Sequence, residues 1–313
     1  MHPAYSIIIF TAASGAGYGQ VIALALAALA GRPADGAVLS GFIAAFCLVG
    51  AGLLASTFHL GRPGRAWRAF SQWRTSWLSR EALLALATYA IAGGFAWAWL
   101  ARPAGDPLLV GLALAAAVAA ALTVVCTAMI YASLKPIPAW RNGWVVPVYL
   151  ALGLASGAAW LAVLDHLFGV GGPFIGRLTA AALAVAIALK LAYWRHIDAP
   201  RDGPTPETAT GLGALDQVRL LDAPHTAAHF VMKEMGYRIA REHGQALRRL
   251  ALWGGLAPAL ALTGLATLGA DAMTASAALL AAVLTSVGVT IERWLFFAEA
   301  RHAAMLYYGT THV

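Results

Sequence analysis

Eight long apolar runs occupy most of the 313-residue chain, and they limit the folds open to it. Each run is long enough, as a helix, to cross a hydrocarbon core of about 30 Å. Because lipid offers no partner for backbone N–H and C=O groups, and the runs lack the alternation of barrel strands, only helices satisfy them. The sequence therefore predicts an all-α integral membrane protein, a bundle of eight transmembrane helices. The expected spans are roughly 5–30, 37–60, 80–101, 107–134, 144–168, 173–195, 247–269 and 273–298.

Composition supports this class and excludes some cofactors. Charged residues make up 11% of the chain, against about 25% in soluble domains. Cys47 and Cys126 lie inside apolar runs, where we expect packing thiols, and two cysteines are too few for an iron–sulfur cluster. A haem is not expected either, because His59 and His166 fall on opposite sides of the membrane and so do not face each other.

Basic residues are distributed unevenly across the predicted membrane. Of the 21 Lys and Arg residues, 17 fall on the side that carries both termini and three on the other, while Lys190 lies inside a span and is expected to snorkel outward. The basic side comprises the 62–80 and 135–143 loops, the 195–249 segment and the C-terminal end. The positive-inside rule therefore predicts a bacterial inner-membrane protein with both termini and the His59 loop in the cytoplasm. The net charge of +7 is a topology signal, and no nucleic-acid partner is expected.

The chain is expected to form a single membrane-anchor domain, 1–313, with a surface amphipathic segment at about 196–246. From about residue 214, apolar residues recur at helical spacing and basic residues interleave with them. Such a segment either lies on the lipid surface or docks a soluble partner, and the pattern does not separate the two.

Two spans contain glycines four residues apart, Gly15 with Gly19 and Gly153 with Gly157. This spacing lets helix backbones approach each other closely. We expect these glycines to serve packing within the chain in preference to dimerisation.

The stretch FHLGRPGRAWRAFSQWRTSWLSRE, residues 58–81, places a histidine, five arginines, three tryptophans and a glutamate between two apolar runs. Ionisable groups at membrane depth are costly, and they mark pathways, ligands or partners. The imidazole of His59 can exchange a hydrogen bond with a quinone carbonyl oxygen and a proton with its surroundings near neutral pH. Glu81, at the start of the third span, can relay protons between a quinone and water.

Other residues of the stretch complete a candidate quinone-binding set. Arg62 and Arg65 follow the histidine by one and two helical turns, and a cation there favours a negatively charged reduced ring. The flat ring of Trp67 can stack on a quinone head, and Ser79 is expected to cap the third span. Each type of residue also has a structural explanation: a helix-end anchor for the histidine, a first-turn carboxylate for the glutamate, lipid-headgroup contacts for the arginines and an interfacial belt for the tryptophans.

Three blocks resemble the membrane anchor subunit family of dimethyl sulfoxide reductase (DmsC-type), within the complex iron–sulfur molybdoenzymes. They are the 58–81 stretch, LLDAPHTAAHFVMKEMGYRIAREHG at 220–244 and ERWLFFAEARH at 292–302. The resemblance implies a molybdopterin catalytic subunit, a four-cluster iron–sulfur subunit, and an anchor that exchanges electrons with ubiquinone or menaquinone and lacks haem. In this family the histidine of the HLG motif and the glutamate that opens helix 3 are tied to quinol binding, and here they match His59 and Glu81.

The predicted orientation distinguishes branches of that family. The founding branch works on the periplasmic side, whereas a cytoplasmic arginine-rich loop is more similar to the sulfite dehydrogenase (SoeC-type) branch. The resemblance therefore implies sulfite oxidation, with quinol-driven reduction of dimethyl sulfoxide or a similar oxide as the alternative. A secondary transporter would show inverted repeats, which the sequence lacks, and a purely structural anchor is the remaining alternative. The terminal substrate, the kind of quinone, the direction of electron flow and the oligomeric state stay open.

Overall fold

The computed structural model describes residues 3–30, 35–58, 60–169, 171–199, 203–222, 235 and 239–310. Within these ranges the chain has no strand, and eight helical spans are long and apolar enough to cross a membrane, which confirms the predicted fold class. Seven spans are single helices: α1 (Tyr5–Ala30), α2 (Asp35–Thr57), α3 (Trp77–Ala101), α4 (Pro107–Ala132), α5 (Val145–Leu167), α6 (Pro173–Asp198) and α11 (Ala272–Ala298). The seventh span in chain order combines α9 (Ile239–Arg249), η2 (Leu250–Leu256) and α10 (Ala257–Ala266).

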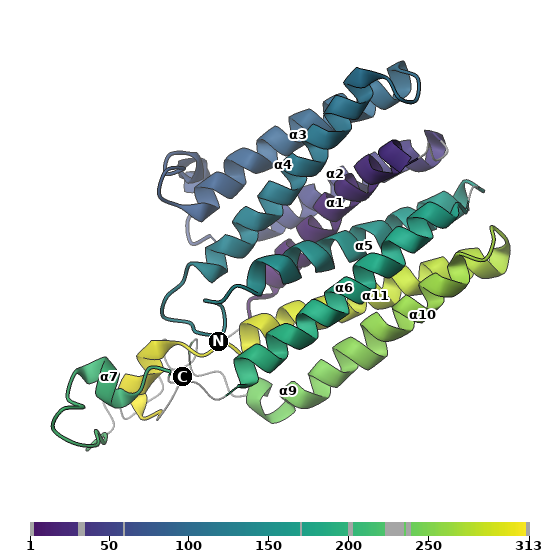
Figure 1. Ribbon diagram of the computed structural model, residues 1–313. Helices are drawn as coiled ribbons and strands as arrows, with labels where there is room; N and C mark the ends of the chain where they lie inside the picture. Colours follow the sequence, from purple (N-terminus) through teal and green to yellow (C-terminus); the bar gives the residue numbers. More distant parts are fainter. Residues whose placement is uncertain are drawn as a thin grey trace.

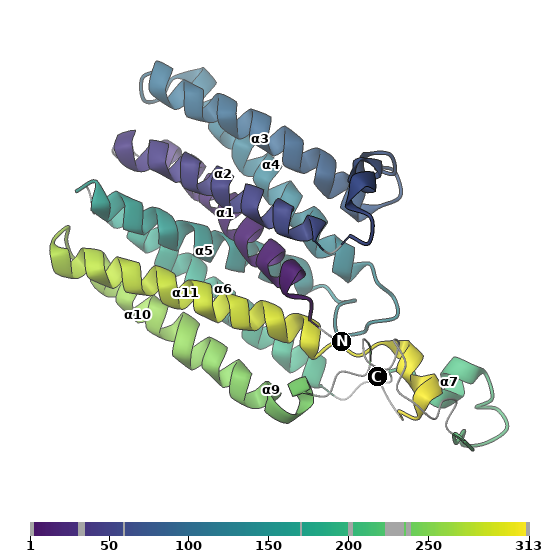
Figure 2. The same cartoon turned by 180° about the vertical axis from the view of Figure 1, so that it is seen from behind.

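The helices form a bundle with α1 and α5 at its centre. These two spans are the most deeply buried, and α1 contacts α2, α4 and α5. Figures 1 and 2 show the α3–α4 hairpin on one side of α1 and α2, and the helices α5, α6, α10 and α11 on the other. Both ends of the chain lie at one end of the bundle, together with the short helix α7 (Pro206–Thr210). This end is called the terminal end below, and the opposite one the far end.

The contact between α1 and α5 depends on the glycines that the sequence singles out. A methyl group at Gly19 would overlap the carbonyl group of Gly153, and a methyl group at Gly157 would overlap the backbone nitrogen of Gln20. The backbones of the two central helices therefore meet with no side chain between them. The predicted use of these glycines for packing within the chain is confirmed.

Replacing Gly157 by alanine should force the two central helices apart. The added methyl group would collide with backbone atoms of α1, which cannot rotate away as side-chain atoms can. We expect a loss of about 1–3 kcal/mol of stability, measured by thermal unfolding of the purified protein in detergent. Gly111→Ala in α4 is the matched control, because a Cβ there meets no atom within 4 Å. Equal unfolding temperatures for the two variants would contradict this packing.

The start of α3 differs from the prediction. The helix begins at Trp77, and its N-cap is Ser76, whose hydroxyl accepts a hydrogen bond of 3.4 Å from the N–H of Ser79. The assignment of Ser79 as the cap is therefore wrong. The prediction placed the boundary at the charged pair Arg80 and Glu81, but Ser76 has the extended backbone that a cap requires, and the helix starts a turn earlier.

The range predicted for the surface segment, about 196–246, includes the end of α6 and most of α9. Residues 211–222 form turns and irregular backbone, so the helix expected from residue 214 does not begin there. A glycine in the left-handed conformation ends α7 just before this stretch and interrupts helical hydrogen bonding. Residues 223–234 and 236–238 lie outside the described residues, as does the rest of the expected amphipathic pattern.

The seventh span is not a regular helix, because η2 is a π-helical segment. Pro258 lies in the first turn of α10, lacks an N–H and would clash with the carbonyl group four residues earlier in a regular helix. The wider π turn accommodates the proline ring. Gly255 of η2 packs directly against Gly288 of α11, which holds the wide turn against its neighbour.

The two cysteines are free thiols. Cys126 is buried, as predicted, whereas Cys47 lies on an exposed face of α2, so the expectation of a buried thiol is wrong there. An apolar run does not reveal which of its faces packs against other helices.

Candidate functional site

The residues predicted to bind quinone occupy two levels at the terminal end of the bundle. Arg62, Arg65 and Trp67 belong to the exposed connection between α2 and α3. Ser79 and Glu81 lie deeper, inside α3, and each is only 3% exposed. The structure therefore divides the predicted set into a surface group and a buried group.

The surface group is carried by η1 (Pro63–Phe70), a 3-10 helix of eight residues. Pro63 occupies its first position, where a missing N–H costs nothing, and the N–H of Arg65 donates to the carbonyl of Arg62 at 3.0 Å. Trp67 is 64% exposed, with the guanidinium of Arg68 lying 5.6 Å from its ring centroid. The surface group thus presents cations and an aromatic ring outward. The predicted quinone ligand just before η1, His59, lies outside the described residues.

Arg80 fastens this connection to α3. Its Nε donates to the carbonyl of Trp73 at 2.9 Å, and its Nη2 donates to the carbonyl of Arg74 at 2.7 Å. The guanidinium also lies 4.3 Å from the centroid of the Trp77 ring. Arg80 therefore holds the loop in place by contacts within the chain.

Glu81 is a buried carboxylate between α3 and α4. The hydroxyl of Thr127 donates to its Oε1 and also lies 3.1 Å from the carbonyl oxygen of Thr123. Further along the same interface, the hydroxyls of Thr88 and Thr123 are 3.0 Å apart. Because a buried carboxylate without a donor is costly, Thr127 is the contact that keeps Glu81 inside the bundle. Together these groups form a polar seam between α3 and α4.

Tyr18 brings a second polar group toward Glu81 from α1. The side chain is 2% exposed, and its hydroxyl has no hydrogen-bond partner among the described residues. An electrostatic interaction links this hydroxyl to the Glu81 carboxylate, with no hydrogen bond between them among the described residues. A buried hydroxyl without a partner costs about 1–3 kcal/mol and is a donor available to a ligand. The sequence did not reveal Tyr18, because nothing in an apolar run distinguishes one tyrosine from another.

The outer surface next to this buried group is apolar. Stacked rings join α2 and α3 halfway along the helices, where Phe46 and Tyr89 have centroids 5.3 Å apart. Nearer the terminal end, Leu54 of α2 and Leu86 of α3 are 65% and 58% exposed. A lipid-soluble molecule approaching this side would meet leucine side chains first and the polar groups behind them.

A second group of buried charges, which we call the ionic trio, joins α6 to α11. Glu292 is paired with Lys190, whose Nζ lies 2.5 Å from Oε1, and with Arg293, whose Nε lies 2.5 Å from Oε2. All three side chains are at most 2% exposed. The prediction that Lys190 snorkels to the interface is wrong, because its salt bridge holds the ammonium group inside the bundle. With two cations and one carboxylate, the ionic trio has a net charge of +1.

Aromatic rings surround the two cations of the ionic trio. Lys190 Nζ lies 4.0 Å from the ring centroid of Tyr193 and 5.0 Å from that of Trp194. The guanidinium of Arg293 lies 3.8 Å from the centroid of Tyr149. Such cation–π contacts replace part of the hydration that these groups lose on burial.

Tyr131 of α4 lies between the two buried charged groups. Its hydroxyl interacts electrostatically with both Glu81 and Arg293. Its ring stacks on Tyr149 at 6.1 Å and meets Trp140 edge-on at 5.3 Å. The charges of the two sides of the bundle are therefore separated by a packed aromatic layer.

The members of the ionic trio should respond unequally to substitution. Glu292→Gln leaves two buried cations without a counter-ion, and we expect a loss of about 3–5 kcal/mol. Lys190→Met leaves a neutral Glu292–Arg293 pair and an apolar side chain of similar length, so its cost should be smaller. Thermal unfolding of the purified variants in detergent gives the ranking, and a larger loss for Lys190→Met than for Glu292→Gln would contradict the pairing.

The far end carries polar contacts that join helices. Both ring nitrogens of His166 face carbonyl oxygens, that of Ala162 at 2.8 Å and that of Ala266 at 3.1 Å, which connects α5 with α10. Within the part of the chain that the structure describes, no three His, Cys, Asp or Glu side chains gather closely enough to hold a metal ion.

Comparison with known proteins relates this arrangement to one family. A family profile described as DMSO reductase anchor subunit (DmsC) matches residues 1–197. The chain belongs to this family of anchor subunits. The matched region includes the basic loop, Glu81 and Lys190, so the resemblance carried by the 58–81 stretch is confirmed at the level of the family.

Two relatives match different shares of this anchor subunit. The C subunit of sulfite dehydrogenase from Allochromatium vinosum is 35% identical over 327 residues, spanning 98% of this chain and 99% of that protein. The C component of anaerobic dimethyl sulfoxide reductase from Escherichia coli is 30% identical over 190 residues, spanning 59% of this chain and 65% of that protein. The likeness to the sulfite dehydrogenase protein therefore extends over nearly the whole bundle.

Proposed function

We propose that this anchor subunit exchanges electrons between a partner iron–sulfur subunit and the membrane quinone pool, in a complex that oxidises sulfite. The observation that supports sulfite is the 35% identity to the C subunit of sulfite dehydrogenase over nearly the full length of both proteins. In this proposal the molybdopterin and the four iron–sulfur clusters belong to partner subunits, and the anchor breaks no substrate bond. Reduction of dimethyl sulfoxide or a similar oxide is the second candidate, supported by the shorter alignment with the Escherichia coli protein.

The buried group fits a quinone. A bound quinone, whether ubiquinone or menaquinone, takes up electrons together with protons. The carboxylate of Glu81 is a proton acceptor inside the bundle, and the hydroxyl of Thr127 orients it. Tyr18 supplies a buried hydroxyl with no partner among the described residues, which suits a carbonyl oxygen. Leu54 and Leu86 present an apolar surface to the lipid from which a quinone would enter.

The surface group is assigned a role between the quinone and the partner. We assign His59 a hydrogen bond to a quinone carbonyl oxygen, on the basis of its place in the sequence between α2 and the basic loop. Arg62, Arg65 and Trp67 are exposed, which suits a loop that becomes covered when a cluster-bearing subunit docks. In that arrangement the cations favour negative charge on the reduced ring, and the docked subunit brings its cluster toward it.

Substitutions of Glu81 and His59 should separate quinone chemistry from electron delivery. In the assembled complex, Glu81→Gln should lower sulfite-dependent quinone reduction about a hundredfold, because it removes the proton acceptor. His59→Leu should have a similar effect. Electron transfer from sulfite to a soluble dye should persist in both variants.

Asp106→Asn is the matched control, because it makes the same change of carboxylate to amide at the far end and keeps an oxygen that can cap α4. Wild-type quinone reduction in Glu81→Gln would contradict the proposed role. Loss of dye reduction as well would point to a failure of assembly.

The proposed compartment follows from the distribution of charge at the two ends. The basic loops lie at the terminal end, and by the positive-inside rule this distribution supports a cytoplasmic location for that end. A reporter that works only in the cytoplasm should be active when fused after residue 313. A reporter that works only in the periplasm should be active in the 102–106 loop. The reverse pattern would contradict the orientation and favour the oxide reductase.

A further inference from the structure

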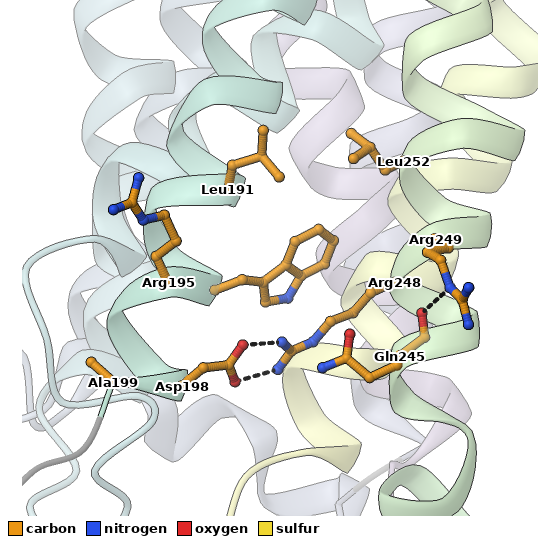
Figure 3. Close-up of a pocket in the computed structure, with 9 residues that line it drawn as sticks. Leu191, Arg195, Asp198, Ala199, Gln245, Arg248, Arg249 and Leu252 are labelled. Carbon is orange, nitrogen blue, oxygen red and sulfur yellow. Dashed lines mark hydrogen bonds and ion pairs between the residues drawn. The ribbon is translucent and has the colours of Figure 1, made fainter.

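A cleft of about 470 Å³ opens at the terminal end between the last turn of α6 and the α9–η2 part of the seventh span. Figure 3 shows that its two halves differ. Leu191 and Leu252 line the half that points along the helices toward the membrane interior, and the arginines 195, 248 and 249 line the half near the helix ends. The cleft is therefore apolar on the membrane side and basic at the terminal end, with a volume typical of ligand sites.

Arg248 lines the basic half of the cleft and is held in place by ion pairs. It makes two hydrogen bonds to the carboxylate of Asp198, at 2.5 and 3.1 Å, and two to that of Glu299, at 2.7 and 3.1 Å. These contacts join α6, α9 and the end of α11. Because four of its five N–H donors are occupied and its charge is compensated, Arg248 shapes the cleft and leaves binding mainly to the other two arginines.

Arg195 and Arg249 have donors to spare. Arg195 is exposed, and it makes no hydrogen bond or ion pair with any residue in the described ranges. Among the described residues, Arg249 makes only a long hydrogen bond of 3.4 Å, from Nε to the carbonyl of Gln245 at the start of the same turn. Two guanidinium groups that can each bind an anion through paired N–H groups therefore border one cleft.

Trp194 adds an unused donor in the wall of the cleft. Its side chain is 6% exposed, and its indole N–H has no acceptor among the described residues. Arg248 lies 5.4 Å from the centre of its ring, and Trp194 lines the cleft. A buried N–H without an acceptor is unfavourable, so this group indicates a ligand that brings an oxygen atom.

We propose that this cleft binds the phosphate headgroup of an anionic phospholipid, with the acyl chains along Leu191 and Leu252. Phosphate oxygens match both the guanidinium groups and the indole N–H, and the leucines continue the site in the direction of the lipid tails. A second cleft of about 460 Å³ shares Leu191 and Arg195 and is lined further by Trp144 and Ala188. It gives room for additional chains of the same lipid.

The charges around the cleft support an anion as the ligand. The cleft has three arginines, and the carboxylates of Asp198 and Glu299 compensate two of their charges. A net charge of +1 remains. The ionic trio adds another +1 directly behind the wall, since Lys190 lies 5.0 Å from the centre of the Trp194 ring. A phosphodiester compensates this excess where few protein carboxylates are available.

Native mass spectrometry of the delipidated full chain tests the proposal, with phosphatidylglycerol, phosphatidylcholine and inorganic phosphate as probes. Phosphatidylglycerol should bind more tightly than phosphatidylcholine. The double variant Arg195→Gln/Arg249→Gln should weaken phosphatidylglycerol binding about tenfold or more, because charge-assisted contacts are lost. Trp194→Phe, which keeps the ring and removes the N–H, should weaken it about threefold. Arg177→Gln, at the far end of the same helix, is the control and should leave binding unchanged.

Several results would overturn the proposal. Equal binding of the two lipids, or an equal loss in Arg177→Gln, would show that the cleft does not select a headgroup. Displacement of the lipid by millimolar inorganic phosphate would identify a site for a small free anion. In the assembled complex, cross-linking of this cleft to an acidic side chain of a partner subunit, with no lipid retained, would show that protein occupies it. Arg195 and Arg249 are exposed, so the double variant should fold. An unfolding temperature equal to that of the unaltered chain would verify this.

Discussion

The requirement that each buried charge find a partner inside the bundle governs this structure. The lipid interior has no water to hydrate a carboxylate or an ammonium group, so each buried charge must be paired or hydrogen-bonded. Glu81 meets Thr127 across the α3–α4 interface, and Glu292 holds both Lys190 and Arg293 between α6 and α11. These contacts decide which helices are neighbours as much as apolar packing does, because apolar surfaces in lipid are interchangeable.

The two ends of the bundle differ in how many charged groups they carry. Glu81 and the ionic trio lie toward the terminal end, which also carries the basic loop and the Arg248 network that ties α6 and α9 to the end of α11. The far end has short connections that are closed by local contacts, such as the Asp271 side chain that caps α11. Hydrogen bonds from the backbone N–H and the hydroxyl of Thr274 hold the pKa of this exposed carboxyl below its ordinary value. Electron exchange with a docked partner and proton exchange with water are therefore both proposed at the terminal end.

The positions and number of the spans could be predicted because apolar length is a local property of the sequence. The glycines of α1 and α5 could also be assigned to packing, since a four-residue spacing of glycines within an apolar run is typical of close contact between helices. The predictions that were wrong depend on contacts between segments that are distant in the sequence. Lys190 looked free to snorkel because its partner Glu292 lies about a hundred residues further along the sequence. The start of α3 was displaced because two serines compete for one cap, and the choice depends on the backbone of the whole loop.

The candidate site divides in the same way. The chemistry of Glu81 was visible in the sequence as a carboxylate beside an apolar run, but its burial against α4 and its proximity to Tyr18 depend on how the α3–α4 hairpin packs. Likewise, a cleft between α6 and α9 cannot be read from arginines separated by a long connection. Only the folded chain brings Arg195 and Arg249 to the two sides of one hollow.

Photolabelling of the assembled complex with an azido-quinone, followed by mapping of the labelled peptides, would show where the quinone binds. The proposed site of quinone chemistry is lined by Glu81 and Tyr18. Labels are expected on α1 near Tyr18 and on the peptide that contains Glu81, with loss of labelling when excess unmodified quinone competes. Labels confined to helices on the other side of the bundle, such as α6 and α9, would contradict it.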